Sequence, residues 1–289
     1  IRYPDRLVYF RPEAGGGLVA GGYERDPAPW NWQEGPPIDF NNTLLEEDWD
    51  RFEPLANGAF SLVPAMREAE IVRMINGPEA FTPDGEFILG ESSVRGFFVA
   101  TGFCAHGIAG AGGVGKVMAE WIVHGEPELD VWTMDIRRFG PHYRARGYAL
   151  ARAVEIYQTY YDIHYPNEER QAGRPLKTGP TYERLQALGA AFGEKAGWER
   201  PNWFERNTDE RFEHLRPRGW AGQHWSTAIA AEHAATRERA ALFDESSFAK
   251  IDVWGSGASA FLQRICANDV DRRAGTIVYT QMLNARGGI

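Results

Sequence analysis

A histidine lies inside a glycine-rich segment, GFCAHGIAGAGGVG, at residues 102–115. Gly110, Gly112 and Gly115 fit the pattern GxGxxG, which in dinucleotide-binding proteins lets the backbone approach a pyrophosphate at a helix N-terminus. Six loop residues separate Gly110 from the preceding apolar run, however, and no acidic residue ends a second strand at the expected distance. The pattern therefore favours a planar, negatively charged group at the helix start, with close packing of helix on strand as the alternative.

His106 is the titratable side chain of this segment. Imidazole titrates near neutral pH and can take a proton from an amine, so His106 is a candidate general base. The alternative is a histidine packed beneath the loop and bonded to the backbone. The sequence leaves both readings open.

Polar side chains also alternate along a predicted hairpin, formed by residues 7–11 and 18–23 around a glycine turn. Side chains two apart share a face of a strand, so Tyr9 and Arg11 point the same way, while Tyr23 and Glu24 point oppositely. Only one of Tyr23 and Glu24 can then face a pocket. Arg11 could bind a substrate carboxylate, or it could be an exposed hairpin arginine.

Composition narrows the classes of function. The chain has 289 residues, 43% of them hydrophobic, and a formal net charge of -9. Such a charge argues against a nucleic-acid partner. No apolar run is long enough to span a membrane, and two distant cysteines have no metal-ligand spacing. We therefore expect no metal site and no disulfide framework.

The remaining pattern predicts the elements that position these residues. A buried strand at 96–103 precedes the glycine-rich loop, and an amphipathic helix follows it at 114–123. Strand, glycine loop and helix form an α/β ligand-binding layout. The pattern also predicts helices at 49–66, 144–166 (ending in a turn at Pro166), 181–198, 230–244 and 257–269, and strands at 249–255 and 276–283.

Seven stretches of the sequence resemble one family in its domain order. The dimethylglycine and sarcosine dehydrogenases have text similar to four of them: VYFRPEAGGGLVAGGYE, INGPEAFTPDGEFILGES, GFFVATGFCAHGIAGAGGVGKVMAEWI and DIRRFG. The aminomethyltransferase (glycine-cleavage T-protein) domain joined to these dehydrogenases resembles the other three: EHAATRERAALFDESSFAKIDVWG, FLQRICANDV and YTQMLNARGGI. The resemblance implies a mixed α/β and α+β fold. Residues 1–137 would be the C-terminal part of a FAD-dependent, D-amino-acid-oxidase-like domain, 138–195 a linking module, and 196–289 the truncated start of a folate-binding domain.

The same resemblance implies an activity. FAD would oxidise an N-methylated glycine, dimethylglycine or sarcosine, and tetrahydrofolate would capture the one-carbon unit. The electron acceptor would be oxygen or an electron-transfer flavoprotein, and the compartment the bacterial cytoplasm or the mitochondrial matrix.

Site residues follow by position. His106, Tyr9 and Tyr23 would be catalytic, and Arg11 and Glu24 would contact substrate. The cofactor-binding residues would be Gly102, Phe103, Gly107, Ile108, Gly112, Gly113, Pro83 and Asp84, with Gly112 and Gly113 opening the helix. Phe248, Tyr279 and Met282 would contact folate, although T-proteins usually have Met where this chain has Phe248, and all three could instead be core.

Two other functions stay open at this point. A regulatory subunit of pyruvate dehydrogenase phosphatase shares the domain order and acts through protein contacts, whereas a stand-alone aminomethyltransferase would leave residues 1–137 unexplained. His106 favours the enzyme, because a regulator has no need of a polar group in that loop. We also expect the sequence to be an internal piece of a longer protein, since the dinucleotide-binding unit and the acidic residue expected after the final GGI are not in it.

Overall fold

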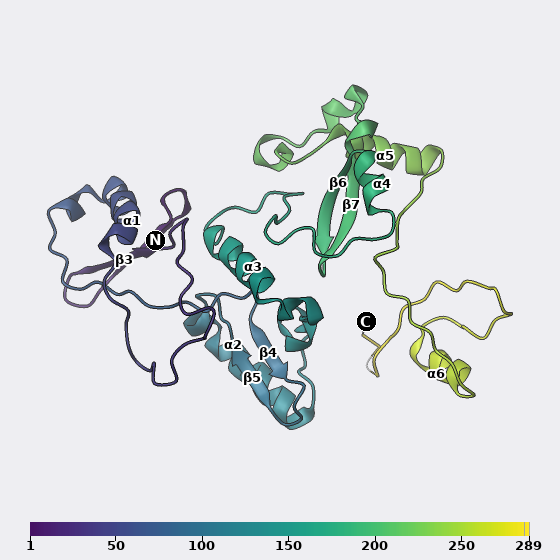
Figure 1. Ribbon diagram of the computed structural model, residues 1–289, viewed down its shortest axis with the longest axis horizontal. Coiled ribbons are helices and arrows are strands. Elements are labelled where there is room, and N and C mark those ends of the chain that lie inside the picture. The colour runs from purple at the N-terminus through teal and green to yellow at the C-terminus, as the bar shows by residue number, and fades with distance from the viewer. Residues whose placement is uncertain (286, 289) are drawn as a thin grey trace. The chain divides into compact units, whose positions relative to one another are not determined.

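The computed structural model describes residues 1–285 and 287–288, which divide into two compact units, Ile1–Asp244 and Glu245–Ile289. Figure 1 labels their elements. The strands are β1 (Arg2–Tyr3), β2 (Val8–Pro12), β3 (Leu18–Gly22), β4 (Ile88–Glu91), β5 (Phe98–Thr101), β6 (Ala190–Lys195) and β7 (Trp198–Phe204). The α-helices are α1 (Trp49–Leu62), α2 (Gly107–His124), α3 (Arg146–Gln158), α4 (Tyr182–Ala187), α5 (Thr227–Glu238) and α6 (Ala258–Ile265). The mixed α/β character predicted from the sequence is confirmed.

The first sheet is the antiparallel order β1-β2-β3, and its predicted hairpin is confirmed. Val8 and Phe10 are buried on one face, where they pack against Leu55 and Ala59 of α1. Because strand side chains alternate, Tyr9 lies on the opposite face, with Gly21 as its partner on β3. A Cβ atom on Gly21 would lie 2.5 Å from the Tyr9 hydroxyl, so this glycine makes room for the ring.

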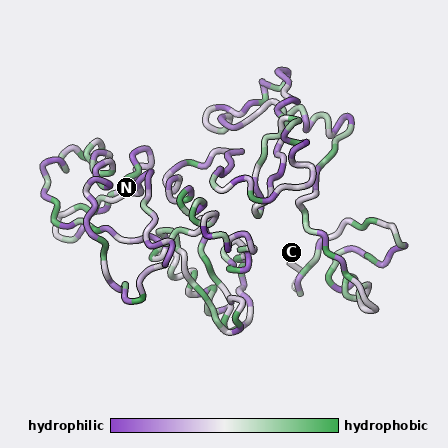
Figure 2. Tube along the Cα trace, viewed as in Figure 1, coloured by the Kyte–Doolittle hydropathy of each residue, from purple (hydrophilic) through white to green (hydrophobic). Residues whose placement is uncertain are grey.

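The second sheet, β4 paired antiparallel with β5, packs against α2. Leu89, Val117, Met118 and Trp121 form its buried core. Gly90, at φ +104°, allows the Trp121 ring to lie against the strand, where a Cβ atom would be 2.6 Å away. Figure 2 shows the hydrophobic residues concentrated along these strands and α2. The predicted strand–loop–helix order is therefore confirmed.

The predicted helix at 181–198 is wrong beyond its first two turns. α4 ends at Ala187, and the chain turns at Gly189, which has φ +79°. A second left-handed turn at Ala196 and Gly197 then folds the chain into the antiparallel hairpin β6–β7. The spacing that suggested a continuous helix placed Phe192 on a helical face, but Phe192 lies on β6. Glycine is favoured at the end of a helix because it tolerates positive φ.

Two predicted strands in the second unit are also absent. The described residues 249–255 and 276–283 run without strand pairing, apart from one bridge between Cys266 and Met282. Ile251, Trp254 and Ile277 are 78%, 89% and 96% exposed. A strand needs a neighbouring strand for its backbone hydrogen bonds, and this part of the described chain offers none. The helix predicted at 257–269 is α6, and the one predicted at 230–244 is α5, which begins and ends earlier.

Candidate active site

The loop from Gly102 to His106 joins β5 to α2 in an unusual backbone conformation. Gly102, Cys104 and Ala105 have φ of +64°, +45° and +66°, a region that costs non-glycine residues about 1–3 kcal/mol each. A Cβ atom on Gly102 would lie 2.6 Å from Thr82. The Cys104 thiol is buried and lies 3.4 Å from the Thr82 amide. Residues 82 and 104 thus fix the loop from beneath.

His106 sits at the end of this loop, immediately before the first residue of α2. Its Nδ1 lies 2.8 Å from the Cys104 carbonyl oxygen, and its Nε2 lies 3.2 Å from the Tyr160 hydroxyl. A carbonyl oxygen only accepts, so Nδ1 carries the proton. In the neutral ring Nε2 is then the accepting nitrogen, and Tyr160 donates to it.

Five rings meet beside His106. We call Tyr23, Phe81, Tyr157, Tyr160 and Tyr161 the aromatic cluster. The centroids of Tyr23 and Tyr160 are 4.6 Å apart, those of Phe81 and Tyr157 4.9 Å, and those of Tyr160 and Tyr161 5.3 Å. The cluster therefore joins the end of β3, the 81–85 turn and the end of α3, which are far apart in the sequence.

Two carboxylates border the aromatic cluster. Glu24 accepts a hydrogen bond of 2.7 Å from Tyr157, and Glu79 accepts one from the Ala105 amide. Burial raises the pKa of Glu79, and burial, with Glu79 nearby, raises the pKa of Tyr23. Tyr23 is therefore protonated at neutral pH, so it can donate a hydrogen bond but cannot act as a base.

α2 begins five residues before the glycines expected to open it. Gly107 is its first residue, and the first hydrogen bond of the helix runs from the Gly110 amide to the His106 carbonyl, at 2.8 Å. The expectation that Gly112 and Gly113 open the helix is therefore wrong, because they lie in its second turn. Sequence periodicity placed the start too late because the first turn has few apolar side chains to mark it.

The glycines of α2 have different surroundings. A Cβ atom on Gly110 would lie 2.8 Å from Phe87, so Gly110 is a packing position. Gly112 and Gly113 have open space around them. Ile108 is 98% exposed, whereas Phe103 packs its ring 5.1 Å from that of Phe87. The exposed surface at this end of α2 is thus made of small residues and Ile108.

The turn at Pro83, Asp84 and Gly85 supports the loop. Arg138 binds Asp84 through two hydrogen bonds, of 2.6 Å and 2.9 Å, and Thr82 donates to Asp84 at 3.1 Å. The Asp84 carboxylate is therefore engaged within the chain. Its predicted contact with a cofactor stays a prediction.

Among the described residues, Arg11 pairs with Glu13 at 3.0 Å and not with the aromatic cluster, and both side chains are exposed. Phe248, Tyr279 and Met282 belong to the second unit, where they are 45%, 85% and 57% exposed. The alternative expectation, that these three side chains lie in the core, is therefore wrong. Their predicted folate contacts stay predictions.

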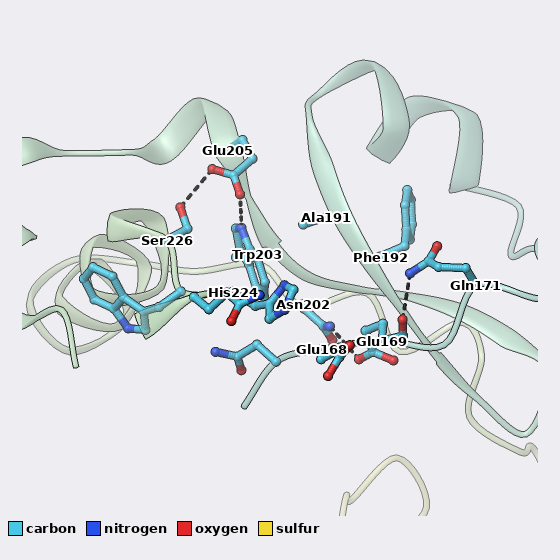
Figure 3. A pocket seen from close by; sticks show the side chains of 13 residues that line it. Glu168, Glu169, Gln171, Ala191, Phe192, Asn202, Trp203, Glu205, His224 and Ser226 are labelled. Carbon is cyan, nitrogen blue, oxygen red and sulfur yellow. Dashed lines mark hydrogen bonds between the residues drawn. The ribbon is translucent and has the colours of Figure 1, made fainter. Parts of the chain in front are cut away.

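A separate cavity of about 500 Å³ lies between the 167–171 segment, β6, β7 and the 223–226 segment, with none of the predicted site residues in its wall (Figure 3). Its carboxylates are held by the chain itself: Glu169 accepts from Asn202 at 2.9 Å, and Glu205 accepts from Ser226 at 2.8 Å and from Trp203. The described residues contain no group of acidic, histidine and cysteine side chains suited to a metal ion. Nor is any described helix long and apolar enough to cross a membrane.

Comparison with known proteins matches three families along the chain. Residues 1–121 match the FAD dependent oxidoreductase family, residues 124–179 the FAD dependent oxidoreductase central domain, and residues 181–289 the GCVT N-terminal domain. Sarcosine dehydrogenase of Mus musculus is 34% identical over the whole chain, which covers 33% of that protein. The predicted resemblance to the dimethylglycine and sarcosine dehydrogenases is confirmed.

Two other proteins similar to this chain have different names. The 4-methylaminobutanoate oxidase (formaldehyde-forming) of Paenarthrobacter nicotinovorans is 38% identical over 99% of the chain and 34% of its own length. The pyruvate dehydrogenase phosphatase regulatory subunit of Mus musculus is 37% identical over 98% of the chain and 32% of its own length. The chain therefore spans about a third of the relatives it matches, and overall identity does not separate oxidases from the regulator.

The sequence pattern identified the His106 loop but not the side chains that lie beside it. The residues it missed are Phe81, Glu79, Tyr157, Tyr160 and Tyr161. The tyrosine-rich text YQTYYDIHY at 157–165 was a visible signal. It was interpreted only as the end of a helix, because nothing in its spacing says which distant segment covers it.

Proposed function

We propose that the protein containing this chain oxidises an N-methylated glycine, dimethylglycine or sarcosine, with FAD, and passes the one-carbon unit to tetrahydrofolate. One observation carries the proposal: His106 presents an accepting Nε2 beside the aromatic cluster, immediately before the first residue of α2. The match of residues 1–121 to the FAD dependent oxidoreductase family and of residues 181–289 to the GCVT N-terminal domain supports both halves.

The residues at the start of α2 fit a flavin. The amides of Gly107 and Ile108 precede the first hydrogen bond of the helix, at the end that carries partial positive charge. Gly112 and Gly113 leave open space on the same helix. FAD bound there would be the acceptor of two electrons from the methyl carbon of the substrate. Gly102, Phe103, Pro83 and Asp84 would hold the loop and turn that face it.

The chain's own groups would handle the substrate's charge. An N-methylated amine reaches the protein as an ammonium ion, and aromatic faces attract such ions by about 0.5–2 kcal/mol. Glu24 adds negative charge at the border of the aromatic cluster. Once the Tyr160 hydroxyl turns its proton away from Nε2, His106 would take the ammonium proton at that atom and so free the nitrogen lone pair that oxidation requires. Tyr23 and Tyr9 would orient the substrate by hydrogen bonding.

Arg11 would bind the substrate carboxylate only after leaving Glu13, its partner at 3.0 Å. Phe248, Tyr279 and Met282 offer exposed apolar surface on which a folate ring could stack. The electron acceptor would be oxygen or an electron-transfer flavoprotein, in the cytoplasm of a bacterium or the mitochondrial matrix.

A regulatory role is the second candidate, because the pyruvate dehydrogenase phosphatase regulatory subunit is 37% identical over 98% of the chain. One experiment separates the two. The full-length protein is purified and mixed anaerobically with sarcosine, dimethylglycine or 4-methylaminobutanoate, while flavin absorbance is followed near 450 nm. Bleaching supports oxidation. A colourless protein, or a flavin that no methylated amine reduces, rejects it and leaves the regulator.

A further inference from the structure

We propose that Tyr160, on the linking segment after α3, is a positioning residue that holds His106 in its accepting orientation. The inference rests on the proposed function for its kinetic consequence, but the contact itself does not. The Tyr160 hydroxyl lies 3.2 Å from His106 Nε2 and is the only hydrogen-bond partner of that atom among the described residues. A side chain 54 residues away in sequence thereby fixes the imidazole.

Tyr160 is itself held on several sides. Its ring packs against Tyr23, Phe81 and Tyr161, at centroid distances of 4.6 Å, 5.4 Å and 5.3 Å. Arg2 donates to its carbonyl oxygen at 3.2 Å. The Tyr160 ring therefore has little freedom to move, and it holds its hydroxyl beside His106.

The phenol also has the right protonation state. Burial raises the pKa of Tyr160, and Arg2 opposes this effect only in part. The hydroxyl is thus protonated at neutral pH and can donate to a neutral imidazole. Because Nε2 has one lone pair, the Tyr160 hydroxyl must turn its proton away before His106 takes a proton from the substrate ammonium at Nε2, and the same oxygen can then accept a hydrogen bond from the new N–H. Tyr160 thereby serves both states of the histidine without exchanging a proton of its own.

The neighbouring Tyr161 supplies a matched control. It is buried in the same aromatic cluster, 6% exposed, and has no described hydrogen bond to His106. Tyr160→Phe and Tyr161→Phe each remove one hydroxyl and keep the ring. Both variants of the full-length protein should therefore fold, and only the first should affect the histidine.

The first readout needs no activity. Diethyl pyrocarbonate acylates neutral imidazole nitrogen, and the rate at His106 is followed by mass spectrometry of its peptide. Loss of a hydrogen bond from Nε2 should speed acylation about five-fold in Tyr160→Phe and leave Tyr161→Phe at the wild-type rate. An unchanged rate in Tyr160→Phe, or equal increases in both variants, overturns the proposal.

The second readout is the anaerobic rate of flavin reduction. Tyr160→Phe should lower the limiting rate about ten-fold while the half-saturating substrate concentration stays the same, since positioning acts on the reacting histidine. The same change made in a His106→Ala background should cost nothing further. Additive losses would overturn positioning through His106. A wild-type flavin that no amine reduces would reject the proposed function, and the acylation rates would still decide the contact.

Discussion

Two separate substitutions, Gly102→Ala and Gly112→Ala, should change local stability in opposite directions. At Gly102 a new Cβ atom would lie 2.6 Å from the Thr82 methyl carbon. Thr82 is 3% exposed, and its hydroxyl shares its one proton between Asp84 and the Glu86 carbonyl oxygen, so it cannot move aside. The φ of +64° costs an alanine about 1–2 kcal/mol, and relieving the overlap costs about 1–3 kcal/mol more. We expect a loss of about 2–5 kcal/mol.

Gly112→Ala is the control. Gly112 lies inside α2 with nothing near its missing Cβ atom, so alanine should stabilise the helix by about 0.5–1 kcal/mol. Amide hydrogen exchange of the full-length variants, read on peptides from β4, β5 and α2, measures both. Gly102→Ala should exchange about 30-fold faster or more, and Gly112→Ala no faster than wild type. Unchanged exchange in Gly102→Ala would refute the reasoning about the loop.

Two further predictions concern buried groups. Burial raises the pKa of Tyr161 to about 12. Because the folded state holds that proton more tightly than the unfolded state, the contribution of Tyr161 to the free energy of unfolding is complete below about pH 10. It falls by about 2–3 kcal/mol as the pH rises toward 12. Alkaline unfolding followed by fluorescence should show Tyr161→Phe losing less stability over that interval, and an equal loss would contradict the assignment. Arg174 binds Glu199 at 2.9 Å and 2.6 Å with 10% and 3% of the side chains exposed; Arg174→Met should therefore destabilise β6–β7 by about 3–5 kcal/mol. Adding Glu199→Gln should recover much of that loss in urea unfolding, and no recovery would mean that the buried charge is not its cause.

The sequence predicted elements whose evidence is local. The hairpin of β2 and β3, the helices α1 and α3, and the strand–loop–helix around His106 each have a periodic apolar pattern with turn residues at the ends. The helix expected at 181–198 failed because Gly189 ends α4 and the next apolar residues belong to a strand. Two strands expected after residue 248 failed because pairing depends on a neighbour, which local pattern does not reveal.

The candidate site divides in the same way. His106 and Gly102 lie in one continuous segment and were identified from it, whereas the aromatic cluster is assembled from segments separated by more than fifty residues. Tyr160 contacts His106 across 54 positions, and Tyr157 contacts Glu24 across 133. Periodicity indicates which face of an element is apolar. It does not say which distant side chain will cover that face.

The aromatic cluster combines residues from the first 121 residues with residues at and just after the end of α3, and this has a consequence for recombination between related proteins. The two regions match separate families, with the boundary between residues 121 and 124. Recombination at that boundary would leave each matched region whole. A chimera joined at that point would nevertheless pair one parent's Tyr23 and Phe81 with another parent's Tyr157 and Tyr160. Such hybrids should keep their folds but lose the ring contacts of the aromatic cluster unless the rings of both regions are exchanged together.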